Sequence, residues 1–216
     1  MENLLSRERV RHLLEATFTA LLFGTQTILN AGWAISVMAI PLLPYLAYLL
    51  MGQANPEREI QVLFFAKEFV VGRIIALVGF AVLFIAGTQF LLNLSKGVGF
   101  IRTGLYSRVR HPQFMGIVII AIGLTVMVLT LGTVNQPQII GLWLIQILGY
   151  IGIARYEEMH LLKRFGESFR QYRRDVPFIF PIRLSYRIPE TMFTILIAVL
   201  ICFFFLVFPF NLILIY

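Results

Sequence analysis

Two long apolar runs of the chain are separated by the polar, basic stretch Gly104-Leu105-Tyr106-Ser107-Arg108-Val109-Arg110-His111-Pro112-Gln113-Phe114-Met115-Gly116. Arg and His beside a membrane span are costly to desolvate, so they usually lie at the interface or face a polar cavity. An apolar hairpin follows, and then Arg155-Tyr156-Glu157-Glu158. Because two spans return the chain to the face it left, we expect Glu157 and Glu158 to meet Arg110 and His111. This meeting of opposite charges is the predicted active site.

The composition predicts an all-α, polytopic bundle of transmembrane helices. Apolar residues make up 59% of the 216 residues and charged residues only 13%, too few to cover a soluble globule of this size. Several uncharged runs reach the ~20 residues that cross a ~30 Å hydrocarbon core. The expected spans cover about 13–30, 33–51, 69–92, 113–133, 138–154 and 190–215. Five spans are the alternative, because residues 13–30 are rich in threonine and fit an interfacial amphipathic helix as well.

These spans divide the chain into three parts. Residues 1–92 form N-terminal transmembrane helices, residues 93–187 form the core that carries the polar segments, and residues 188–216 form a C-terminal transmembrane helix. Small residues let helices approach closely in a membrane. The stripe of Gly72, Gly79 and Gly87 therefore predicts tight packing of the third span.

The positive charge is concentrated at one side of the hairpin. The net charge is +7, and twelve of the 18 Lys and Arg residues fall in 93–112 and 155–187. This positive-inside pattern places the active-site loops on the cytoplasmic side, with anionic membrane lipids as partners rather than nucleic acid. The single cysteine, Cys202, excludes an intrachain disulfide.

The predicted pocket holds a guanidinium, an imidazole and two carboxylates beside apolar walls. Such a pocket suits a zwitterionic ligand, and aromatic groups could stack on a base or face a cation. The candidate aromatic groups are Tyr106, Phe114, Tyr156, Phe165 and Tyr172. No metal site is expected. The competing interpretation is that these charges only cap helices and bind headgroups.

Residues 157–172 have the pattern of an interrupted helix. Leu161, Phe165, Phe169 and Tyr172 recur at three- and four-residue steps on one apolar face. Gly166 is expected to end or bend this helix. The segment Val176-Pro177-Phe178-Ile179-Phe180-Pro181 excludes a regular helix beyond it.

The ordered combination of these motifs resembles the isoprenylcysteine carboxyl methyltransferase family, which is grouped with the phospholipid methyltransferases. The shared order is Gly-x-Tyr, Arg-His-Pro-x-Phe-x-Gly, an apolar hairpin, Glu-Glu-x-x-Leu-x-x-x-Phe-Gly-x-x-Phe-x-x-Tyr and Val-Pro-x-x-x-Pro. The match covers roughly 93–181, whereas 1–92 and 188–216 share only hydropathy with the family.

The resemblance implies an integral-membrane enzyme that uses S-adenosylmethionine and methylates a lipophilic acceptor arriving from the bilayer. It places the cofactor between the hairpin and the polar C-terminal segment. It also implies that Arg110 lies close to the reacting centre. The implied cofactor-binding residues are Tyr106, His111, Pro112 and one of the two glutamates, Glu157 or Glu158, which stay alternatives. Tyr172 is a further candidate for the cofactor site. Phe114 and Phe169 each stand where the family often has Tyr.

Methyl transfer from a sulfonium mainly requires alignment of donor and acceptor and exclusion of water. Arg110 and Glu158 are the expected catalytic residues, and two alternatives stay open for them. Arg110 could hold an acceptor carboxylate bidentately, or Glu158 could serve as the base for an acceptor amine.

Two other functions compete with this prediction. Membrane sterol or steroid reductases that use NADPH carry a related His-Pro-x-Tyr-x-Gly stretch, but an acidic residue follows its glycine, where this chain has Ile117. A small transporter or a scaffold is the non-enzymatic alternative. The spans carry no paired intramembrane charges and no repeat, and both absences disfavour transport.

Overall fold

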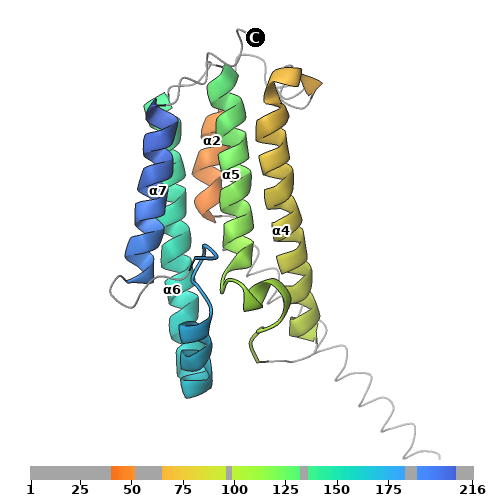
Figure 1. The fold of residues 1–216 in the computed structure, drawn as a ribbon, viewed down its shortest axis with the longest axis vertical. Helices are drawn as coiled ribbons and strands as arrows, with labels where there is room; N and C mark the ends of the chain where they lie inside the picture. Colours follow the sequence, from red (N-terminus) through yellow and green to blue (C-terminus); the bar gives the residue numbers. More distant parts are fainter. Residues whose placement is uncertain (1–39, 52–64, 96–98, 132–135, 183–188, 208–216) are drawn as a thin grey trace, which may run out of the picture.

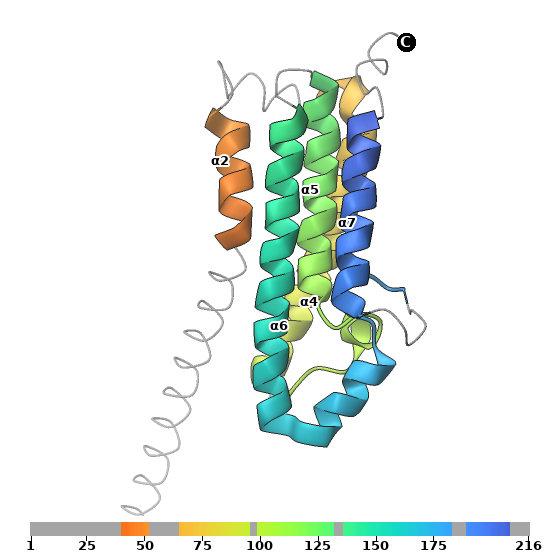
Figure 2. The ribbon, with the colours of Figure 1, turned by 90° about the vertical axis from the view of Figure 1, so that its left-hand side faces the viewer.

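The computed structural model describes residues 40–51, 65–95, 99–131, 136–182 and 189–207. Every regular element in these ranges is helical, which confirms the predicted all-α class. The longer helices stand side by side with their axes roughly aligned, and α6 extends beyond the others at one end (Figures 1 and 2). The elements are η1 (Ile40–Leu42), α2 (Leu43–Met51), η2 (Lys67–Phe69), α4 (Val70–Ser95), η3 (Gly104–Ser107), α5 (Pro112–Leu131), α6 (Gln136–Asp175) and α7 (Glu190–Val207).

Within the described residues, four helices are long and apolar enough to cross a membrane. They cover Lys67–Asn93, Pro112–Thr130, Pro137–Asp175 and Glu190–Val207. These helices confirm the last four expected spans as far as the structure describes them; residues 208–215 of the last one lie outside the described residues. The first expected span, 13–30, lies outside the described residues. Of the second, 33–51, the structure describes η1 and α2.

Helices α4 and α5 are in close contact through glycines. A Cβ atom added to Gly79 would lie 2.6 Å from the backbone nitrogen of Ile120, and one added to Gly123 would lie 2.6 Å from the backbone nitrogen of Ala76. Gly72 of α4 and Gly116 of α5 meet similarly close atoms. The predicted tight packing is therefore confirmed for Gly72 and Gly79. It is wrong for Gly87, because an added Cβ would meet nothing within 4 Å there.

Helix α6 differs from the prediction in its length. A span was expected to end near residue 154, but helical structure continues through the charged residues to Asp175, with a break at Gly166. The helix before this break, residues 136–165, is about 45 Å long at 1.5 Å per residue, longer than the ~30 Å hydrocarbon core, so the polar half of α6 extends beyond the apolar layer. Gly166, with φ 53° and ψ −125°, bends this half back toward the bundle, as predicted (Figure 2).

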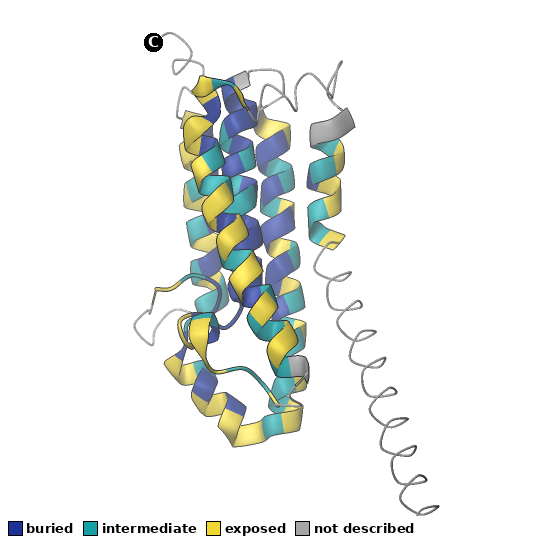
Figure 3. Cartoon of the chain, turned by 90° about the vertical axis from the view of Figure 1, so that its right-hand side faces the viewer, coloured by how far each residue is buried: buried dark blue, intermediate teal, exposed yellow. Residues whose placement is uncertain are grey.

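The bundle interior is packed around large aromatic side chains. Trp143 and Tyr150 of α6, Phe114 of α5 and Tyr45 of α2 are fully buried. The Tyr45 hydroxyl donates to the carbonyl oxygen of Ala121 at 3.0 Å, so its polar tip is satisfied within the bundle. By contrast, the outward face of α4 is apolar and exposed (Figure 3), as expected for a helix that contacts lipid.

Candidate active site

The polar stretch before α5 folds as a short 3-10 turn held against α4. Gly104 has φ 64°, and a Cβ there would collide with the side-chain amide of Gln89. That amide oxygen accepts a hydrogen bond from the backbone N–H of Leu105 at 3.1 Å. The glycine is therefore required both by its backbone angle and by the close approach of α4.

Arg110 and His111 are fixed by the segment that follows α6. The backbone N–H of Arg110 donates to the carbonyl oxygen of Pro177 at 2.9 Å, and that of His111 donates to Phe178 at 3.2 Å. Pro112 is the first residue of α5. At this position the missing N–H of proline removes no hydrogen bond from the helix. The Phe178 ring contacts His111 edge-on, with ring centroids 5.3 Å apart.

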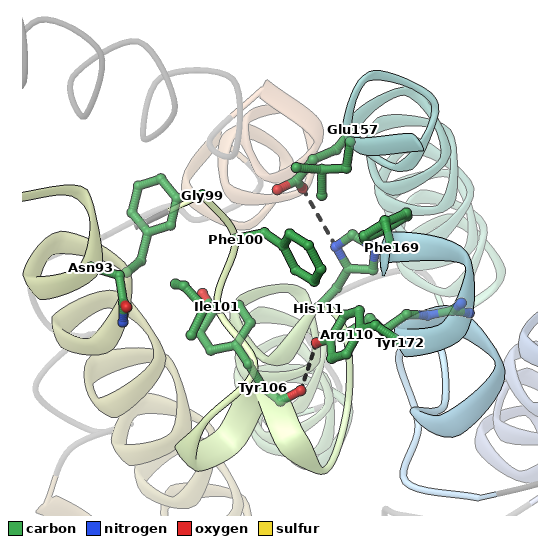
Figure 4. A pocket seen from close by; sticks show the side chains of 12 residues that line it. Asn93, Gly99, Phe100, Ile101, Tyr106, Arg110, His111, Glu157, Phe169 and Tyr172 are labelled. Atoms are coloured by element: carbon green, nitrogen blue, oxygen red, sulfur yellow. Dashed lines mark hydrogen bonds and ion pairs between the residues drawn. The ribbon is translucent and has the colours of Figure 1, made fainter. Parts of the chain in front are cut away.

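The His111 ring lies between the two glutamates that the sequence singled out. Its Nδ1 is 3.4 Å from Oε2 of Glu157, and its Nε2 is 3.4 Å from Oε1 of Glu158 (Figure 4 shows the first contact). Burial lowers the pKa of His111, but the hydrogen bonds and negative charges of Glu157 and Glu158 outweigh burial and raise this pKa. The imidazole is thus stabilised in its protonated, cationic form.

Glu158 is buried among cations. Its side chain is 3% exposed, and its carboxylate lies 3.2 Å from Nε of Arg110, 2.9 Å from Nη1 of Arg155 and 3.6 Å from Nε of Arg173. A buried carboxylate needs such partners to offset its lost hydration. The Glu157 side chain is 39% exposed. The two neighbouring glutamates therefore occupy different environments.

The Arg110 guanidinium extends away from this centre toward α7. Its Nη1 donates to the carbonyl oxygen of Arg173 at 3.0 Å, and its Nη2 pairs with the carboxylate of Glu190, the first residue of α7. Its Nε is close to Glu158 but is not aligned for a hydrogen bond. All three guanidinium nitrogens are therefore in contact with groups of the protein.

A cavity lies between α4, the turn before α5 and the polar half of α6. Its volume is about 110 Å³, and it is partly open to solvent. Its lining residues are Phe90, Asn93, Gly99, Phe100, Ile101, Tyr106, Arg110, His111, Glu157, Leu161, Phe169 and Tyr172 (Figure 4).

The structure brings together most of the predicted site residues. Five of them line the cavity, namely Tyr106, Arg110, His111, Glu157 and Tyr172. Glu158 and Pro112 are buried and are not among the lining residues. Of the aromatic candidates, Phe114 stacks on His111 from the bundle interior.

Aromatic side chains form one wall of the cavity. The Phe100 ring lies 5.3 Å from Phe169 and 5.4 Å from Tyr172, centroid to centroid. The Tyr172 hydroxyl donates to the backbone oxygen of Tyr106 at 2.6 Å, which ties the bent end of α6 to the turn. Burial, together with the charge of Glu157, raises the pKa of the Tyr106 phenol, so this group stays neutral. The cavity lining thus combines flat apolar surfaces with the carboxylate of Glu157 and the basic side chains of Arg110 and His111.

Sequence reasoning missed several residues of this site. Phe90 and Asn93 come from the end of α4, and Phe100 and Ile101 come from the connection after it. These residues belong to no motif, and only their proximity to the polar stretch could have indicated them. Glu190 lies in the first turn of α7. Its pairing with Arg110 was not predicted.

The fold and this cluster define a membrane-embedded helical protein with a largely apolar, partly enclosed cavity that carries charged groups on its wall. A family model described as a protein of unknown function, DUF1295, matches residues 9–176. The chain belongs to this family. No curated protein and no solved structure matches the chain.

Proposed function

We propose that the protein is an S-adenosylmethionine-dependent methyltransferase that acts on a lipophilic acceptor. One observation carries this proposal: Tyr106, His111, Glu157 and Tyr172, drawn from two distant motifs, line one cavity that is partly open to solvent. The order of the motifs, which resembles that of isoprenylcysteine carboxyl methyltransferases, supports the same assignment at the family level.

The cavity residues suit the different parts of such a cofactor. Phe100 and Tyr172 offer aromatic faces for a base or a cation. Glu157 is the carboxylate on the cavity wall and would accept hydrogen bonds from hydroxyl or ammonium groups. The His111 imidazolium supplies the opposite charge. When bound, S-adenosylmethionine supplies an electrophilic methyl group on its sulfonium.

Within this proposal, the surroundings of Arg110 and Glu158 favour orienting roles for both. Glu158 is enclosed by three arginines and His111, which stabilise its charged form and make it a weak proton acceptor. Arg110 has protein partners at every guanidinium nitrogen. These two residues therefore hold His111 and the turn in place, and Glu157 is the acidic group nearest to an incoming ligand.

The acceptor is proposed to enter from the bilayer along the end of α4. Phe90 lines the cavity, and the next two residues, Leu91 and Leu92, are exposed on the outward face of the same helix. An apolar chain lying on that face would place its head near Phe90 and Asn93. A lipophilic molecule can thus approach without crossing the charged end of α6.

The cavity is proposed to face the cytoplasm because the positive charge gathers at that end. Single cysteines introduced at the exposed Ser107 and Glu167 in a Cys202→Ala background test this orientation. A membrane-impermeant thiol reagent should label both only from the cytoplasmic side. Labelling of either from the opposite side contradicts the orientation.

A binding experiment tests the proposed function directly. Purified protein in detergent should retain tritiated S-adenosylmethionine, and Glu157→Gln should abolish retention because it removes the cavity carboxylate. Glu167→Gln is the matched control, since Glu167 is exposed and pairs with Arg170 and Arg174 away from the cavity. Retention of NADPH in place of S-adenosylmethionine would favour the reductase and overturn the proposal.

A further inference from the structure

The site includes a carboxylate that lies beyond the family-matched region. The family model ends at residue 176, yet Glu190 of α7 pairs with Arg110 inside the candidate site. A second contact joins the same helix to the site, because Nη2 of Arg155 lies 3.4 Å from the Thr191 hydroxyl. The start of α7 therefore reaches two of the three arginines that pair with Glu158.

Arg110 needs this carboxylate because it has almost no contact with water. Its side chain is 1% exposed, and a buried guanidinium is stable only with partners for its charge and its donors. Glu158 supplies one negative charge but also contacts His111, Arg155 and Arg173. Glu190 supplies a second negative charge and draws the guanidinium toward α7.

The competition for Glu158 links Glu190 to His111. One oxygen of Glu158, Oε1, lies 3.2 Å from Arg110 and 3.4 Å from His111. Without Glu190, the positive charge of Arg110 would be balanced mainly by that oxygen. Less of the negative field of this Glu158 oxygen would then act on the imidazolium of His111. The direction in which the Arg110 side chain extends would also no longer be fixed.

We propose that Glu190 is a positioning residue of this site, which acts through Arg110 to hold Glu158 and His111 in their charged arrangement beside the cavity. The inference deepens the proposed function and rests on it, because the proposed function is what makes this cluster an active site. It makes α7 a part of the catalytic unit, although the family-matched sequence ends before this helix.

Nuclear magnetic resonance of selectively labelled histidine in detergent micelles tests the inference without cofactor or acceptor. The chain has three histidines. The His111 signal is identified by its loss in His111→Gln, and the exposed His160 serves as an internal reference. The charged groups around His111 are Glu157, Glu158, Arg155 and Arg173 from α6, Arg110 beside it and Glu190 from α7. The matched control is again Glu167→Gln, which removes the same charge from the exposed surface.

We expect the pKa of His111 to fall in Glu190→Gln and to keep its wild-type value in Glu167→Gln. Glu190→Asp keeps the charge but shortens its reach, so the pKa of His111 should fall less, and this variant serves if Glu190→Gln does not fold. A lowered melting temperature with an unchanged His111 pKa means a structural role only and overturns the proposal. An equal fall in Glu167→Gln overturns it too.

The outcome is separable from that of the proposed function. If the His111 pKa falls as expected but S-adenosylmethionine is not retained by the wild-type protein, the positioning role stands and the methyltransferase proposal fails. If the cofactor is retained and the pKa of His111 does not change, the methyltransferase proposal stands and the positioning role fails.

Discussion

Glu157 and Glu158 are neighbours in sequence but face different surroundings. Glu157 lies on the cavity wall, half-exposed and beside His111. Glu158 is buried and contacts three arginines as well as His111. Successive residues on a helix point about 100° apart, so one helix presents one carboxylate to the cavity and the other to the protein interior.

The two glutamates should therefore respond differently to the same substitution. Glu158→Gln leaves several buried cations without their partner and should lower the free energy of unfolding by about 3–5 kcal/mol. Glu157→Gln should lower it by less than about 1 kcal/mol, because its side chain is partly solvated. Thermal unfolding in detergent measures both. Equal losses would contradict the assignment of Glu158 to the interior.

The raised pKa of His111 predicts how stability depends on pH. Its stabilising contribution is complete below the unfolded value near 6.5 and is lost as pH rises through the higher folded pKa. The melting temperature should therefore fall as pH increases above neutrality. In His111→Gln this part of the pH dependence should be missing. A variant with the wild-type pH profile would place the titrating group elsewhere.

The sequence predicted that Arg110 and His111 would meet the glutamate pair, but not which glutamate would face the cavity. Because the apolar hairpin returns the chain to the face it left, both motifs must lie at the same end of the bundle. This return does not fix the rotation of α6 about its axis, on which the choice between adjacent residues depends. The pair of Arg110 and Glu190 lies 80 residues apart, and no periodic pattern relates the two positions.

Among the helices, α4 and α5 depend on small residues for their contact. A side chain at Gly123 would collide with the backbone of α4, whereas one at Gly87 would meet open space. Helix association in a membrane relies on such close packing. Sequence spacing identified the stripe on α4 but could not tell which of its members faces α5.

Alanine substitutions should separate these positions. Gly123→Ala should destabilise the protein by about 1–3 kcal/mol, because the backbone of α4 must shift. Gly87→Ala should be neutral or should stabilise it by up to about 1 kcal/mol through its helix propensity. Thermal unfolding of both variants under identical conditions provides the comparison. A greater loss in Gly87→Ala would mean that α4 packs through a different face.

The bend at Gly166 is the second feature that depends on one glycine. Its φ and ψ are outside the range that residues with a Cβ readily adopt. Gly166→Ala should therefore straighten the polar half of α6, cost about 1–3 kcal/mol and withdraw Phe169 and Tyr172 from the cavity. Binding of S-adenosylmethionine should weaken with it. Gly152→Ala, at a helical position with open space, is the control and should bind normally.

The continuity of α6 could not be read from hydropathy. The change from apolar to charged residues at Arg155 indicates where the helix leaves the apolar layer, but not where it ends. Glu, Met, Leu, Lys and Arg all favour helix, so the backbone continues until Gly166 bends it. The charged motif thus lies on a rigid helix, which positions its side chains better than a loop would.

Over the whole molecule, the bundle and the cavity have separate roles. The apolar helices α4, α5, α6 and α7 anchor the chain in the membrane. The cavity lies where α4, the turn before α5 and the bent end of α6 meet. In the proposed function, a water-soluble cofactor and a lipophilic acceptor would reach this place from two directions.

The most direct test of the account is methyl transfer in membranes that contain the protein. With S-adenosylmethionine tritiated on its methyl group, label should appear in the lipid extract or in a lipophilic protein fraction. Incorporation should persist in Glu167→Gln and disappear in Glu157→Gln. Label that enters no fraction above the level of membranes without the protein, while the purified protein retains NADPH, would contradict the account.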